Sequence, residues 1–172
     1  MKKTTFWGKQ VEYTGDMKLA YAVKAQPPRS QSVKVIAWVY AAVLTVMVVG
    51  QLFAFEDFIP LIANYWLPGG NGTASLVGCL IVVTEVFAIP YLLRMPLSPL
   101  MRWTSMICGL IVPTIWIKLA ITALVTDNAL TNSGMLGTKV SIHAGAMQLV
   151  FSLLIAVLAI WSAWGLWPAR KK

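Results

Sequence analysis

Four apolar stretches, each about 20 residues long, constrain the fold of this sequence more than any other feature. They cover residues 35–55, 75–93, 104–125 and 144–167. They are too long for strands of a soluble core, and about 20 helical residues cross the roughly 30 Å hydrocarbon layer of a membrane. Because lipid offers no hydrogen-bond partner to a peptide group, each stretch must be helical. The sequence therefore predicts an all-α membrane protein, a bundle of four transmembrane helices.

The composition and the placement of charge agree with a lipid environment. Hydrophobic residues make up 58% of the 172 residues and charged residues 12%, which is about half the usual charged share. A soluble fold could not cover so much apolar surface. The net charge is +8, but the basic residues lie almost wholly in the tails and one short turn. This pattern indicates contact with anionic lipid headgroups, and no nucleic acid is expected as a partner.

The distribution of Lys and Arg predicts the orientation of the bundle and its division. On one side of the membrane, Lys139 is the only such residue beside the apolar stretches. On the other side there are nine: Lys18, Lys24, Arg29, Lys34, Arg94, Arg102, Arg170, Lys171 and Lys172. Positive charge is retained in the cytoplasm. We therefore expect a basic cytoplasmic tail over 1–34, the bundle over 35–167, a basic cytoplasmic end over 168–172, and an inner or plasma membrane location.

The two segments expected to face outward, 56–74 and 126–143, differ in pattern. In the first, apolar residues recur at helical spacing after the acidic pair Glu56 and Asp57, which favours a short helix on the membrane surface. The apolar positions are Phe58, Leu61, Ile62, Tyr65 and Trp66. The glycine-rich run 68–72 then predicts a flexible return into the second span. Aromatic borders are expected at Tyr65 and Trp66 outside. Inside, they are expected at Trp38, Trp103, Trp164 and Trp167.

Two ionisable residues fall inside the apolar stretches, where each costs roughly 2.5 to 3.5 kcal/mol at mid-depth. Glu85 lies near the middle of the second stretch, and Lys118 lies in the outer half of the third. The economical expectation is that the two are partners, reached by the lysine stem or through a bridging group. Thr114, Lys118 and Thr122 follow one helix face as a polar stripe, expected to point into the bundle or toward a partner subunit. The pair could be a structural clamp, a functional proton-handling site, or a headgroup contact at a quinone or lipid cleft.

Further polar candidates are Gln51, His143 and Gln148. The fourth stretch carries a small and polar stripe that permits close helix approach: Gln148, Ser152, Ala156, Ala159 and Ala163. Gln51 and His143 stand at outer span ends, where simple solvation is the common outcome. Pro90 and Pro113 free the carbonyl groups of residues 86 and 109 and are expected to bend both helices. We find no catalytic set and no metal-ligand spacing, and we expect no cofactor ligated by the chain itself.

One region resembles the DoxX/MauE superfamily of four-helix membrane proteins. The stretch from Gly50 through Gln51-Leu52-Phe53-Ala54-Phe55 to Phe58 is similar to a glycine, Lys or Gln, Leu-Phe pattern of that family. It leads through Tyr65-Trp66-Leu67-Pro68 to a second span with Glu85. The resemblance covers roughly residues 40–125. It implies a redox-associated accessory role.

Two functions from different classes remain open. The first is an accessory or assembly subunit of a membrane redox system, within a larger membrane complex or a homo-oligomer. The second is a small proton-coupled carrier in which Glu85 titrates and Lys118 is its counter-charge. A stand-alone enzyme ranks last, because catalysis would have to rest on isolated residues.

Overall fold

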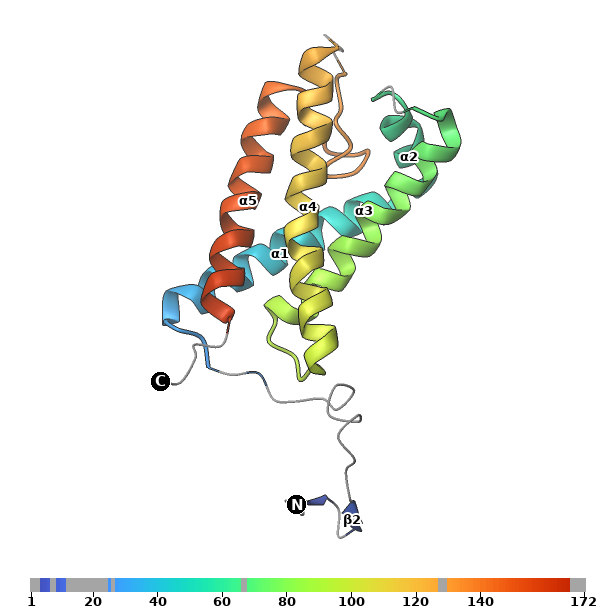
Figure 1. Ribbon diagram of the computed structural model, residues 1–172. Helices are drawn as coiled ribbons and strands as arrows, with labels where there is room; N and C mark the ends of the chain where they lie inside the picture. Colours follow the sequence, from blue (N-terminus) through green and yellow to red (C-terminus); the bar gives the residue numbers. More distant parts are fainter. Residues whose placement is uncertain are drawn as a thin grey trace.

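A computed structural model describes residues 4–6, 9–11, 25, 27–65, 68–126 and 130–167 of the chain. Within these ranges the protein forms five α-helices (Figure 1): α1 Gln31–Phe53, α2 Phe55–Ala63, α3 Gly70–Leu92, α4 Pro99–Val125 and α5 Ala146–Leu166. Four of them, α1, α3, α4 and α5, are long and apolar enough to cross a membrane. The prediction of a multi-pass, all-helical bundle is confirmed at this level.

The N-terminal segment holds two short strands that the sequence analysis did not predict. β1 (Thr4–Phe6) pairs antiparallel with β2 (Lys9–Val11), in a register that places Thr4 opposite Val11. β1 consists of β-branched and aromatic residues, which suit extended backbone, whereas β2 has one such residue, Val11. The all-α description therefore applies to the bundle and not to this segment.

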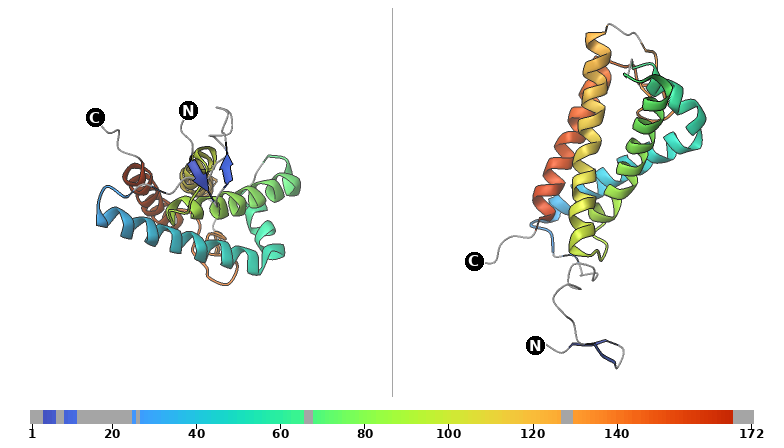
Figure 2. Two further views of the ribbon diagram at one scale, coloured as in Figure 1. Left: turned by 90° about the horizontal axis from the view of Figure 1, so that it is seen from below. Right: turned by 45° about the vertical axis from the view of Figure 1, so that its right-hand side comes forward.

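The four long helices close into a ring. α3 packs on α4, α4 on α5, α5 on α1, and α1 on α3. Figure 2 shows α4 and α5 side by side, with α1 crossing them at a steep angle. The backbone N–H of Arg29 donates to the carbonyl of Gly165 at 3.3 Å, which joins the start of α1 to the end of α5. These two ends and the 93–98 turn therefore share one end of the bundle, whereas α2 and the 130–145 segment lie at the other.

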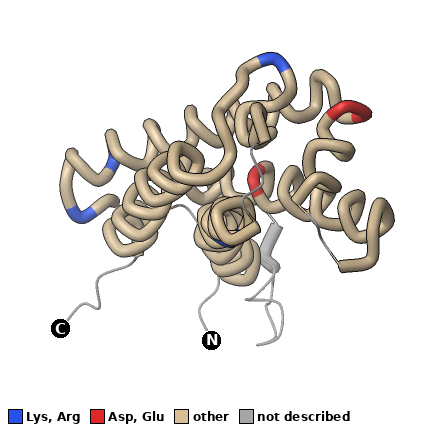
Figure 3. The backbone as a smooth tube through the Cα atoms, turned by 90° about the horizontal axis from the view of Figure 1, so that it is seen from above, with Lys and Arg blue, Asp and Glu red and all other residues tan. Residues whose placement is uncertain are grey.

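The burial pattern is that of a protein solvated by lipid. Large apolar side chains lie exposed on the outside of all four long helices, among them Val46, Leu76, Ile121 and Ile160. Charged residues are sparse along these helices (Figure 3). Glycines permit close packing inside: a Cβ at Gly78 of α3 would lie 2.6 Å from Cδ1 of Ile59 in α2. On α5 the predicted small stripe is buried at Gln148, Ser152 and Ala159, and half-buried at Ala156 and Ala163.

The chain between α2 and α3 differs from its prediction. The glycine-rich run was predicted to be a flexible return, but α3 already begins at Gly70 and includes Asn71 and Gly72. Gly69 has φ +103°, a left-handed conformation that glycine adopts without a steric penalty, and it stands immediately before the first helical residue. Helix α3 therefore includes two of the three glycines of this run.

Near both prolines inside the long helices, a side chain from another helix bonds to the backbone. Pro113 has no N–H to give to Gly109, and the hydroxyl of Tyr40 in α1 donates to that carbonyl instead, at 2.5 Å. Next to Pro90, the backbone N–H of Tyr91 donates to Oγ of Ser105 at 3.1 Å, and Ser105 Oγ donates to the Phe87 carbonyl at 2.5 Å. Side chains from α1 and α4 therefore satisfy backbone groups near both prolines.

Candidate functional site

Glu85 is the centre of a buried polar cluster in the bundle. Its side chain is fully buried in α3. Nε2 of Gln51 in α1 donates to Glu85 Oε1 at 3.3 Å, and Nε1 of Trp116 in α4 donates to the same oxygen at 3.1 Å. Three helices that are distant in sequence therefore meet at one carboxylate oxygen.

Residues 130–145, between α4 and α5, pack against this cluster. In Figure 1 this segment turns back from the end of α4 and enters the space between α4 and α2. Gln51 Nε2 donates to the carbonyl of Met135 in this segment at 3.2 Å. The backbones of Gly50 and Gly137 approach so closely that a Cβ on either glycine would collide with the other segment. The segment is thus packed against α1 and is part of the site.

A second branch of the cluster joins the end of α2 to α5. The hydroxyl of Tyr65 lies 2.9 Å from the Ser133 carbonyl and 3.0 Å from Oε1 of Gln148, and both are acceptors for it. Burial raises the pKa of the Tyr65 phenol above its ordinary range, while the hydrogen bonds to Gln148 and Ser133 lower it. Tyr65 is thus a neutral donor that ties the loop to two other elements.

Three buried polar atoms in this cluster have no hydrogen-bond partner within the described chain. They are Oε2 of Glu85, Oε1 of Gln51 and Nε2 of Gln148. All three side chains are fully buried. A buried polar group without a partner costs about 1 to 3 kcal/mol. Such groups in a native protein point to an internal water, ion or ligand.

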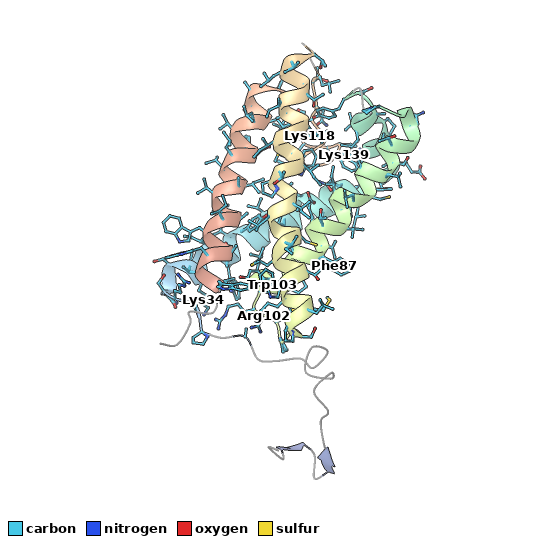
Figure 4. All side chains as sticks on the ribbon, in the orientation of Figure 1. Lys34, Phe87, Arg102, Trp103, Lys118 and Lys139 are labelled. Carbon is cyan, nitrogen blue, oxygen red and sulfur yellow. The ribbon has the colours of Figure 1, made fainter. Side chains whose placement is uncertain are left out.

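The predicted pairing of Glu85 with Lys118 is wrong. Lys118 lies on the exposed face of α4, whereas Glu85 is fully buried and takes its hydrogen bonds from Gln51 and Trp116. The polar stripe was expected to point into the bundle or toward a partner subunit, and the structure contradicts the first of these two directions. Thr114 is exposed and Thr122 half-buried, and their hydroxyls donate to the carbonyls of residues 110 and 118 of the same helix. Figure 4 labels Lys118 on α4, at a distance from Lys34 and Arg102 at the opposite end.

The other sequence candidates divide between the interior and the surface. Gln51 was expected to be solvated at a span end, but it is fully buried because its amide bridges Glu85 and the Met135 carbonyl. Tyr65 was expected at an aromatic border and is buried instead, and Trp66 lies outside the described residues. His143 is exposed. The structure thus brings Gln51, Glu85 and Gln148 into one cluster and leaves the remaining candidates outside it.

Sequence reasoning missed three members of the site: Trp116, Tyr65 as a hydrogen-bond donor, and the loop carbonyls. Trp116 lies one position beyond the midpoint of an apolar stretch, away from the borders where tryptophan collects, and its indole N–H needs a partner there. In the loop, the Asn132 side-chain oxygen accepts from the N–H of Gly134 at 2.9 Å, a turn pattern visible in the sequence as Asn-Ser-Gly. These two signals could have identified the ordered loop and the donor.

The cluster holds one carboxyl group among neutral donors and backbone carbonyls. Among the described residues, no three side chains of His, Cys, Asp or Glu come together in a way that could hold a metal ion. Comparison of the chain with models of protein families, with curated proteins and with solved structures finds no match. Chemically, the arrangement is suited to holding a proton or a small cation at the carboxyl group.

Proposed function

We propose that this chain is an accessory or assembly subunit of a membrane redox system and binds a larger membrane partner along α4. The observation that carries the proposal of a partner is the exposed position of Lys118. The redox association rests on the resemblance of residues 40–125 to the DoxX/MauE superfamily. A quinone or a lipid is the small molecule that such a subunit could bind.

The charged Lys118 side chain raises the free energy of the bundle in lipid unless another molecule covers it. It stands seven residues before the end of α4 at Val125, about 10 Å below the helix end at 1.5 Å per residue. Side chains on a helix tilt toward its N-terminus, so the lysine stem starts in the direction away from the nearer end. Extending it to water therefore works against that tilt. A charged group left in lipid at depth costs roughly 2.5 to 3.5 kcal/mol on insertion scales.

The surroundings of Lys118 extend the polar surface. Thr114 and Thr122 lie one turn to either side of it, and both hydroxyls keep unused acceptor capacity while they donate to their own helix. A partner helix with polar groups would cover all three residues at once. Polar contacts of this kind hold membrane helices together, with measured values near 0.6 kcal/mol and up to about 2 kcal/mol.

A carrier built on Glu85 and Lys118 is the alternative, and its support is weaker. A counter-charge must lie close to the group that it neutralises, whereas Lys118 is exposed and Glu85 is buried among Gln51 and Trp116. A carrier would have to work with Glu85 alone. In that case Glu85→Gln would abolish flux in reconstituted vesicles, and normal flux in that variant would contradict it.

The proposal includes the orientation of the chain. The described basic residues Arg29, Lys34, Arg94 and Arg102 belong to the segments that share one end of the bundle. The positive-inside rule supports placing that end, and with it both termini, on the cytoplasmic side of an inner or plasma membrane. Helix α2 would then lie at the outer surface, with exposed Glu56 and Asp57 toward water.

Purification in mild detergent tests the proposed function. The unmodified chain should bring down a larger membrane enzyme whose absorption spectrum shows a redox cofactor. Lys118→Met should reduce the yield of that enzyme at least several-fold without unfolding the bundle, because the Lys118 side chain is exposed and forms no hydrogen bond or ion pair with a described residue. Lys139→Met, which removes an exposed lysine from the loop, is the matched control and should leave the yield unchanged. A monodisperse chain without a partner would overturn the proposal.

A further inference from the structure

Glu85 carries the only carboxyl group within the four long helices, and its surroundings hold no charge to balance it. Residues 31–53, 70–92, 99–125 and 146–166 contain no other Asp or Glu. The two donors to its Oε1, the Gln51 amide and the Trp116 indole, are neutral. A bare carboxylate in such a place would lose its hydration and gain little in return. The carboxylate therefore needs a positive partner.

The protein's own cations do not supply that partner. No described Lys, Arg or His side chain forms an ion pair with Glu85, whose hydrogen bonds come from Gln51 and Trp116. Lys118 on α4 and Lys139 and His143 in the loop are exposed. The other titratable groups facing the cluster are two tyrosines. Tyr40 donates its hydroxyl to the Gly109 carbonyl, and the single Tyr65 hydroxyl lies within hydrogen-bond distance of two acceptors, the Ser133 carbonyl and Gln148 Oε1.

The unpartnered polar atoms of Glu85 and Gln51 are both acceptors. Glu85 Oε2 and Gln51 Oε1 are both buried and without a donor. The Met135 carbonyl belongs to the same group because Gln51 bonds to it and to Glu85 at once. Oxygen atoms of carboxylate, amide and backbone carbonyl groups are the ligands that hard cations prefer. A single carboxylate matches one positive charge rather than two.

We propose that Glu85 and Gln51, with the Met135 carbonyl beside them, bind a small monovalent cation, either a proton or a sodium ion. The bound charge balances Glu85 and gives its Oε2 a partner. Because Gln51 joins Glu85 to the loop between α4 and α5, occupancy of the site stabilises the packed loop. This site is independent of the exposed face of α4, so it stands or falls separately from the proposed function.

Two measurements on the purified full chain distinguish a bound sodium ion from a bound proton. Melting temperature is measured in sodium chloride and in potassium chloride at equal ionic strength, and infrared spectra are recorded across a pH series to detect a protonated carboxylic acid. Glu85→Gln retains the oxygen that accepts from Gln51 and Trp116 but removes the charge. Glu56→Gln, which removes an exposed carboxylate in α2, is the matched control.

A sodium site predicts a higher melting temperature in sodium than in potassium for the unmodified chain and the control, and no difference in Glu85→Gln. A proton site predicts no salt difference, and a carboxylic acid band at neutral pH that only Glu85→Gln lacks. If Glu85→Gln does not fold, Gln51→Leu replaces it. It should shift the sodium midpoint or the protonation midpoint about tenfold through loss of a buried polar partner. An ionised Glu85 with no sodium dependence would overturn the proposal.

Discussion

At the scale of single residues, Ser105 is the clearest case of a side chain that forms hydrogen bonds with the backbone of another helix. Its hydroxyl accepts from the Tyr91 N–H and donates to the Phe87 carbonyl, one turn from Pro90. Ser105→Ala would leave both buried backbone groups without that partner. We expect a loss of about 1 to 3 kcal/mol in the free energy of unfolding, measured by denaturation of the purified protein in detergent.

Thr104→Val is the matched control for Ser105→Ala. Thr104 is the preceding residue of α4, is exposed, and bonds only to the Leu100 carbonyl of its own helix. Its removal should change the free energy of unfolding by less than about 0.5 kcal/mol. Equal effects of the two substitutions would mean that α3 closes its own hydrogen bond between Tyr91 and Phe87 when Ser105 is absent.

The same scale shows what the sequence could predict of the site. Glu85 could be selected because a carboxyl group inside an apolar stretch is expensive wherever it points. Its partners could not, because the choice between Lys118, Gln51 and Trp116 depends on the rotation of α4 and on where α1 crosses. Coulomb attraction favoured Lys118. Packing instead turned Trp116 inward, and Lys118, two positions away on the helix, was thereby turned outward.

At the scale of elements, the close approach of α1 and the loop between α4 and α5 determines whether the loop stays packed. Gly137 has φ +81°, and a Cβ there would collide with the Gly50 carbonyl. Gly137→Ala should therefore destabilise loop packing by more than about 1 kcal/mol. We expect faster hydrogen exchange at residues 130–145 than in the unmodified protein, with little change in α4 and α5.

Gly72→Ala is the control for Gly137→Ala. Nothing lies within 4 Å of a Cβ at Gly72, which is already helical in α3. Alanine has a higher helix propensity than glycine by about 1 kcal/mol, so this variant should be at least as stable as the unmodified protein. If exchange in the loop were unaltered by Gly137→Ala, the contact between Gly50 and Gly137 would not hold the loop.

The elements also show which parts of the fold the apolar pattern of the sequence predicts and which it does not. The four long helices were predicted within a few residues at most ends, since each must provide enough apolar length to cross lipid. The glycine-rich start of α3 and the loop over the site were not, because intrinsic propensity favours neither helix nor order there. The loop is ordered by contacts with α1 and α2, which a single sequence does not reveal.

At the scale of the whole molecule, the even number of spans predicts which segments lie on the same side of the membrane. The start of α1, the 93–98 turn and the end of α5 share one end, so Arg29 and Lys139 must lie on opposite sides of the membrane. With Cys79 and Cys108 replaced by serine, Lys139→Cys should react with a membrane-impermeant maleimide on intact cells, and Arg29→Cys should react only after lysis. Both positions are exposed, so differences in burial cannot mimic the result. The reverse pattern would place the basic end outside, against the charge asymmetry. Reaction of both positions on intact cells would contradict the four-span topology itself.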